Sequence, residues 1–185
     1  MFDAVLAGHD GPVVGPASFA VRAGEIVGLT GPNGCGKSTL LGALTRTAQV
    51  FRGRVERRSG LTVALQRQRL VRLGDLPITG HDLLRLGRAL EKPVPASLEP
   101  LQCVRLDQLS GGQVQLLYVW AALGGAADLI LLDEPTNNMD PRAVSAVVEI
   151  LQGIEATRGA IVVSHDHGFL ERVCTSIVEV HAYVA

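Results

Sequence analysis

The chain has 185 residues, enough for one domain with a hydrophobic core of its own. Apolar residues make up 47% of it and aromatic residues only 4%, which favours Leu-, Val- and Ala-rich strands buried between helices over aromatic stacking on nucleobases. The formal net charge of −1 gives no general basic field for nucleic acid, and we interpret the arginines clustered between residues 52 and 72 as a solvated face.

We expect neither a membrane span nor a disulfide framework. The longest uncharged apolar stretch, residues 116–127, is much shorter than the ~18 residues that cross a bilayer, and the first residues lack the order of a signal peptide. Cys35, Cys103 and Cys174 are odd in number and widely spaced, without a C-x-x-C pair, so we interpret them as structural.

The order of elements predicts an α/β domain with a largely parallel sheet. Strand-like runs occur at residues 25–30, 61–65, 129–132 and 160–164, and helix-compatible stretches follow most of them. One helix is well marked, because Asp140 can cap it, Pro141 suits its first position and Gly153 can end it. The three prolines between Arg88 and Leu101 predict a tight connecting loop instead of a helix.

Residues 31–39 read GPNGCGKST and carry the most specific motif. They fit G-x-x-x-x-G-K-[ST], and they lie between a strand-like and a helix-compatible segment as a phosphate-binding loop requires. Backbone N–H groups of such a loop point at phosphates, Lys37 faces the β- and γ-phosphates, and the Ser38 hydroxyl can ligate Mg²⁺. A glycine-rich turn without a ligand is the alternative. The motif predicts binding of a nucleoside triphosphate with Mg²⁺.

Residues 129–134 read LILLDE, an apolar strand that ends in two adjacent acids. A carboxylate at the C-terminal end of a buried strand lies at the ligand crevice of an open α/β sheet. Asp133 suits the metal, through water, and Glu134 suits the general base that polarises the attacking water. A solvated turn is the alternative, which the upstream phosphate-binding loop disfavours.

Residues 109–113 read LSGGQ and resemble the signature motif of ABC ATPases. Three more landmarks of that family are present, namely Gln68 after a predicted strand, Asp140 in TNNMD and His165 in IVVSHD. Together with the phosphate-binding loop they stand in the family's order. The resemblance implies an α/β phosphate-loop ABC ATPase domain over residues 1–185. Its implied parts are a largely parallel sheet, an N-terminal antiparallel β portion, and a shortened helical subdomain over about residues 70–125.

The resemblance also implies a head-to-tail homodimer, in which ATP held by one copy meets the signature residues of the other. Its implied catalytic residues are Glu134, His165 and Gln68, and its implied magnesium ligands are Ser38, Gln68 and Asp133. The implied ATP-binding residues are Gly31, Pro32, Asn33, Gly34, Cys35, Gly36, Lys37, Ser38, Thr39, Ser110, Gly111, Gly112, Gln113 and Asp140.

Two assignments have nearby rivals. Gln66 competes with Gln68, which we prefer because the family pattern then falls on residues 63–69 without a gap. His167 lies two residues after His165, and the HDH triplet could form a metal clamp; we prefer His165 as the family's switch histidine because it directly follows a predicted strand.

The segment where the family carries an adenine-stacking aromatic residue has none here. Residues 7–11 read AGHDG, so either His9 takes that place or the base is held loosely. Leu116 and Ala121 stand where the family often has arginine, and the residues themselves suggest no reason for this.

The segment from Gln68 to Arg88 is similar to the ATPase subunits of zinc and manganese uptake systems. The resemblance implies an ATP-hydrolysing transporter subunit with a membrane-spanning partner, at the inner face of the cell membrane in the cytoplasm. The sequences EPTNNMD and SHDHGFLERV resemble F-type ABC proteins instead, so a soluble factor acting on the ribosome is the alternative. A coiled-coil repair ATPase would need heptads that the chain lacks.

Overall fold

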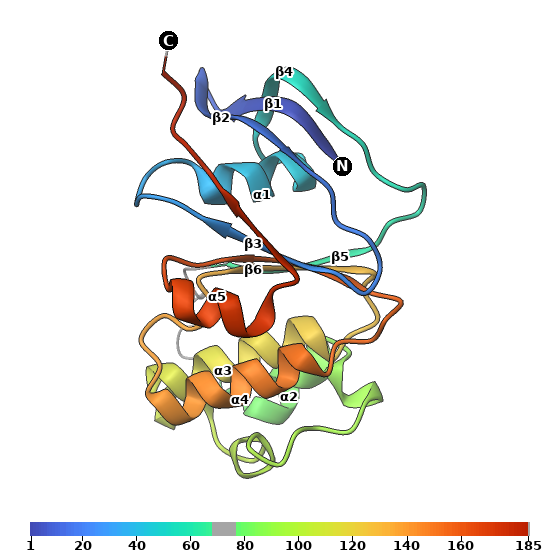
Figure 1. The fold of residues 1–185 in the computed structure, drawn as a ribbon. Helices are drawn as coiled ribbons and strands as arrows, with labels where there is room; N and C mark the ends of the chain where they lie inside the picture. The colour runs from blue at the N-terminus through green and yellow to red at the C-terminus, as the bar shows by residue number, and fades with distance from the viewer. Residues whose placement is uncertain (68–76, 185) are drawn as a thin grey trace.

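The computed structural model describes residues 1–67 and 77–184. Within them two sheets and five α-helices form stacked layers (Figure 1). The strands are β1 (Phe2–Gly8), β2 (Pro12–Phe19), β3 (Ile26–Thr30), β4 (Gln49–Val55), β5 (Val63–Gln66), β6 (Leu129–Asp133), β7 (Gly159–Val163) and β8 (Ser176–Glu179). The helices are α1 (Lys37–Thr45), α2 (Gly80–Leu86), α3 (Gly111–Leu123), α4 (Pro141–Gln152) and α5 (His167–Val173).

The central sheet has the strand order β5-β6-β7-β3-β8, and every neighbouring pair is parallel. β6 and β7 are buried along their whole length, which explains why their sequences are continuous apolar runs. The expected largely parallel sheet is confirmed. The order places β3 and β6 on either side of β7, so the loops after β3 and β6 open at the same edge.

A second, antiparallel sheet has the order β2-β1-β4. Figure 1 shows it stacked above α1, which lies between it and the central sheet. One apolar cluster fills the space between the two sheets, with buried side chains from the antiparallel sheet (Val5), from α1 (Leu40) and from the central sheet (Leu29 and Leu131). The expected N-terminal antiparallel portion is thereby confirmed.

The other helices cover the opposite face of the central sheet (Figure 1). Leu117, Ile130, Leu132, Val147 and Leu170 belong to a second apolar cluster there. Alternate residues of β6 therefore enter different clusters, as the period of a strand requires.

A side-chain cap and a proline mark the start of α4. Asp140 accepts a hydrogen bond from the backbone N–H of Ala143 at 2.9 Å, and Pro141 follows it, as expected. Between Arg88 and Leu101 the described chain forms only the short 3-10 turns Ala89–Glu91 and Glu99–Leu101, in keeping with the prolines there.

Cys35 and Cys174 pack into the apolar clusters while Cys103 is exposed, and all three are free thiols.

Candidate functional site

The phosphate-binding loop connects β3 to the N-terminus of α1. Gly31 and Gly36 have φ values of 143° and 97°, a backbone region that favours glycine. A Cβ on Gly36 would lie 2.5 Å from the Cβ of Val14, and one on Gly31 would lie 2.3 Å from the carbonyl oxygen of Val180. The two glycines thus let the loop lie close to β2 on one side and to the end of β8 on the other.

Lys37 begins α1 and is buried, and its ammonium turns back over the loop. Its Nζ donates to the carbonyl oxygens of Gly31 at 2.8 Å and Pro32 at 3.0 Å. These bonds fix the only charge of the loop above the N-terminus of α1, where the helix dipole also favours an anion. The arrangement suits phosphate oxygens.

Asp133 ends β6 beside α1, as expected for a metal-linked carboxylate. Burial raises the pKa of its carboxyl group, an effect that a hydrogen bond from Ser38 and the charge of Lys37 oppose. Its Oδ1 atom is buried and has no hydrogen-bond partner within the described residues. An unpaired carboxylate oxygen next to a hydroxyl is a donor set that fits Mg²⁺. Ser38 and Asp133 could therefore hold this ion.

Glu134 follows directly and faces His165. The carboxylate is buried, and its Oε2 atom lies 2.9 Å from Nδ1 of His165 at the end of β7. An ionised carboxylate can only accept, so Nδ1 carries the proton in this pair. Glu134 has a φ of 52°, which is uncommon for a residue with a side chain and is held here by its surroundings.

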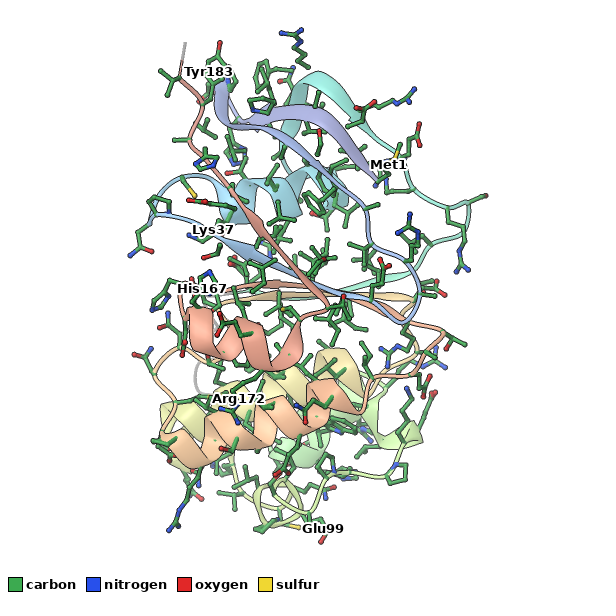
Figure 2. All side chains as sticks on the ribbon, viewed as in Figure 1. Met1, Lys37, Glu99, His167, Arg172 and Tyr183 are labelled. Carbon is green, nitrogen blue, oxygen red and sulfur yellow. The ribbon has the colours of Figure 1, made fainter. Side chains whose placement is uncertain are left out.

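These groups meet in one cavity of about 510 Å³. Its walls come from the phosphate-binding loop, the end of β6 and the end of β7. The lining residues are Asn33, Gly34, Gly36, Lys37, Ser38, Thr39, Asp133, Glu134, Asn137, Val163 and His165. Figure 2 shows Lys37 and His167, two residues after His165, on the same side of the molecule.

A neighbouring cavity of about 560 Å³ shares Ser38, Thr39 and Asp133 with the first. His9 from the β1–β2 hairpin also lines it, so the structure brings His9 beside the phosphate-binding loop. Arg67, at the end of β5, lines it too. Nothing in the local sequence of Arg67 indicates that it lines a cavity together with Ser38.

Gln68 lies outside the described residues. Its rival Gln66 ends β5 and is buried, and its amide donates to the carbonyl oxygen of Arg67. Gln66 pairs in register with Leu132, which belongs to the cluster under the helices. It is not among the residues that line either cavity.

His167 has a carboxylate of its own, because its Nδ1 atom lies 3.5 Å from Oε1 of Glu171 one turn along α5. His165 and His167 thus face different acids. In residues 1–67 and 77–184 no group of three or more potential metal-ligating side chains comes together.

The signature residues lie at the other side of the central sheet from α1. Ser110 and Gln113 form a reciprocal cap at the start of α3: the Gln113 N–H donates to Ser110 Oγ at 3.3 Å, and the Ser110 N–H donates to Gln113 Oε1 at 2.9 Å. None of residues 110–113 lines the cavity of the phosphate-binding loop. One copy of the described chain therefore does not unite the two motifs.

Family models and curated proteins match most of this chain. A family model described as ABC transporter matches residues 14–79, and one described as an AAA domain, putative AbiEii toxin of a type IV TA system, matches residues 101–171. The zinc import ATP-binding protein ZnuC of Paracoccus denitrificans is 36% identical over 96% of this chain and 73% of its own length. That of Cereibacter sphaeroides is 39% identical over 88% of this chain and 70% of its own length.

The chain belongs to the ABC ATPase family. Its relatives identify it as an ATP-binding subunit of the transporter class, similar to zinc import ATP-binding proteins. The chain spans 63% of the length of a third such protein, from Roseobacter denitrificans. These relatives confirm the ABC ATPase fold and family that the motifs predicted.

Solved structures agree with this ABC ATPase fold. The archaeal ribosome recycling factor aABCE1 superposes with a TM-score of 0.79 at 26% identity, over 97% of this chain and 36% of that one. An ATP-binding subunit of an ABC transporter superposes with a TM-score of 0.78 at 24% identity, over 97% of this chain and 85% of that one.

None of the helices in the described part of the chain has the length and apolar character of a bilayer span.

Proposed function

We propose that this ABC ATPase hydrolyses Mg-ATP as a homodimer and drives a membrane-spanning partner that imports zinc or a similar divalent cation. One observation carries the catalytic part: Glu134 and His165 face each other in the cavity that Lys37 and Ser38 also line. The relatives that are named zinc import proteins carry the transport part.

The phosphate-binding loop holds the triphosphate. The N–H groups at the start of α1 and the Lys37 ammonium bind phosphate oxygens, and Ser38 and Asp133 would hold Mg²⁺, which neutralises charge on the β- and γ-phosphates. His9 lies where it can contact the ribose or the base, since it lines the adjoining cavity.

Glu134 acts as the general base in this proposal. It accepts a proton from a water molecule whose oxygen bonds to the γ-phosphorus, while the bond from that phosphorus to the bridging oxygen of ADP breaks. The Nδ1–H of His165 orients the carboxylate, and its 58% exposed side chain can also contact the γ-phosphate or a second copy. By its place in the family pattern, Gln68 would complete the metal and phosphate contacts.

A second copy supplies the signature. Ser110 to Gly112 open α3 with exposed or half-buried residues, and a helix N-terminus favours an anion. Because these residues do not reach the cavity of their own chain, the γ-phosphate of a partner's nucleotide is the ligand that this end of α3 suits. Asp140 would lie at the same interface.

The test is complementation. Cells without their own zinc-import ATPase, but with the cognate membrane protein and solute-binding protein, should regain zinc uptake and growth in chelated medium when they express this chain. The Glu134→Gln variant should restore neither. Uptake that stays absent, while the purified chain hydrolyses ATP, would remove the transport assignment.

A ribosomal role is the second candidate, favoured by the likeness to the archaeal recycling factor. That protein is almost three times as long as the matched region. What it binds therefore does not carry over to this chain. Co-sedimentation of the Glu134→Gln variant with ribosomes in Mg-ATP, without any effect on zinc uptake, would favour this candidate over transport.

A further inference from the structure

The start of α3 lies along the loop that carries Glu134. Gln115, in the second turn of α3, is buried, and its Nε2 atom donates to the carbonyl oxygen of Pro135 at 3.2 Å and to that of Glu134 at 3.5 Å. These bonds cross between elements that lie 19 and 20 residues apart in the sequence. The amide of Gln115 therefore joins the signature helix directly to the backbone of the proposed base.

Gly112 provides a second contact on the same face of α3. A Cβ on Gly112 would lie 3.5 Å from the carbonyl oxygen of Asn138 and 3.6 Å from the Cα of Met139. Residues 112 and 115 are three apart and so share one face of a helix. The first two turns of α3 therefore lie beside the loop from Glu134 to Met139 at its start, through Gln115, and at its end, through Gly112.

This loop is in a conformation that needs support. Glu134 and Asn138 both have positive φ values, 52° and 60°. Such residues persist only where surrounding contacts hold them. Within the loop the N–H of Asn137 donates to the carbonyl oxygen of Glu134 at 3.2 Å. Gln115 adds support from outside the loop, at the residue whose side chain faces His165.

We propose that Gln115 is a positioning residue that makes the orientation of Glu134 depend on the signature end of its own α3. The inference rests on the proposed function, in which Ser110 to Gly112 bind ATP held by a partner copy. About 7.5 Å of helix rise separates Ser110 from Gln115, and a hydrogen-bonded helix moves over that length as one body. Binding at the partner's nucleotide therefore sets the base at this chain's own nucleotide, and the two ATP sites act cooperatively.

The geometry gives the coupling a direction. A displacement of the N-terminus of α3 reaches the carbonyl oxygens of Glu134 and Pro135 through one amide. Lys37 and Ser38 are on α1, on the opposite face of the central sheet. Loss of the Gln115 amide should therefore impair turnover and cooperativity and leave binding of the first nucleotide intact. A contact that only stabilised the fold would not separate these quantities.

The experiment compares Gln115→Met with wild type and with Gln152→Met. Methionine keeps the length of the side chain and removes the N–H donors. Gln152 is the matched control, because its Nε2 also donates to a backbone carbonyl 20 residues away, that of Arg172 at 3.2 Å, on an exposed surface. ATPase rates of the full chain are measured against ATP concentration, with thermal melting as the check of folding.

We expect wild type and Gln152→Met to give sigmoidal curves with a Hill coefficient clearly above 1. Gln115→Met should lower kcat about tenfold and bring the Hill coefficient to about 1, while the Kd for nucleotide under monomeric, dilute conditions changes less than about twofold. The fluorescence of Trp120, the single tryptophan and a residue of α3, should still respond to ATP. That response would show that α3 still engages nucleotide while the base no longer follows it.

If Gln115→Met melts much earlier than wild type, Gln115→Leu and Gln115→Asn are measured below their melting temperatures, and the same split between kcat and Kd is required of them. An unchanged kcat and Hill coefficient in Gln115→Met would overturn the inference, as would a hyperbolic wild-type curve. A wild-type chain that neither hydrolyses ATP nor dimerises would instead overturn the proposed function, which the complementation assay reports independently.

Discussion

Nδ1 of His165 lies 2.9 Å from Oε2 of Glu134, although the two residues are 31 positions apart and follow different strands. β6 and β7 are neighbours in the central sheet, with Asp133 paired in register with Val163. The residues that follow this pair on each strand must therefore emerge side by side. The pair stands at the edge of the sheet where the phosphate-binding loop also opens.

Replacement of Glu134 by glutamine should stop turnover and keep ATP binding. The amide has the same shape but cannot accept the proton, so we expect kcat to fall by about 100-fold or more. ATP should then trap a dimer, seen by size-exclusion chromatography with light scattering. Glu171→Gln, which changes an exposed glutamate that faces His167, is the matched control and should hydrolyse ATP normally. Wild-type turnover in Glu134→Gln would show that another group is the base.

Lys37→Ala should weaken nucleotide binding itself. It removes a buried charge that faces the phosphates, and a charge-assisted hydrogen bond contributes about 1.5–3 kcal/mol, so we expect Kd for Mg-ATP to rise about 10- to 100-fold. Lys92→Ala is the control, because Lys92 pairs with Glu155 at 2.8 Å on the surface. Equal effects of the two substitutions in isothermal titration would contradict the role given to Lys37.

Selection of the base should be weak. The β1–β2 hairpin offers His9 and no larger ring between residues 7 and 11, so we expect the Kd values for Mg-ATP and Mg-GTP to differ by no more than about tenfold, or about 1.4 kcal/mol. His9→Tyr should tighten ATP binding by providing a larger stacking surface. A thousandfold preference of the wild-type chain for ATP would reveal a base contact other than His9.

Asp133→Asn should stabilise the nucleotide-free chain and abolish its turnover. Burial raises the pKa of Asp133 in the folded state above its usual 3.8, so the folded state binds this proton more tightly than the unfolded state does. The stability that this group contributes is therefore greatest below pH 3.8 and is lost as pH rises through the folded pKa. At pH 8 the neutral amide avoids that loss, and we expect a melting temperature about 2–4 °C higher, for about 1 kcal/mol.

The gain from Asp133→Asn should shrink as the pH falls toward the raised pKa, which a series of melts from pH 8 to pH 5 measures. Saturating Mg²⁺ and ATP should reverse the order of stability, since the wild-type carboxylate would then have its ligand. A gain that is the same at every pH would show that burial of charge is not its cause.

The sequence by itself determined those turns, helix starts and strands that depend on a few neighbouring residues. The turns of the phosphate-binding loop follow from glycines at Gly31 and Gly36, the start of α4 from Asp140 and Pro141, and the buried strand before Asp133 from four consecutive apolar residues. Each depends on backbone sterics, capping or hydrophobic burial within a few residues, so its pattern can be read along the chain. The family motifs then indicated which side chains to expect in the site.

Only the tertiary structure decided which distant groups meet. Arg67 lines a cavity with Ser38 because β5 ends beside β6. Gln115 donates to the carbonyl oxygens of Glu134 and Pro135 because α3 packs under the sheet. An arginine at a strand end and a glutamine in an apolar helix have no local signature for such partners. Contacts of this kind are set by the packing of whole layers, which places residues far apart in sequence within hydrogen-bond distance of one another.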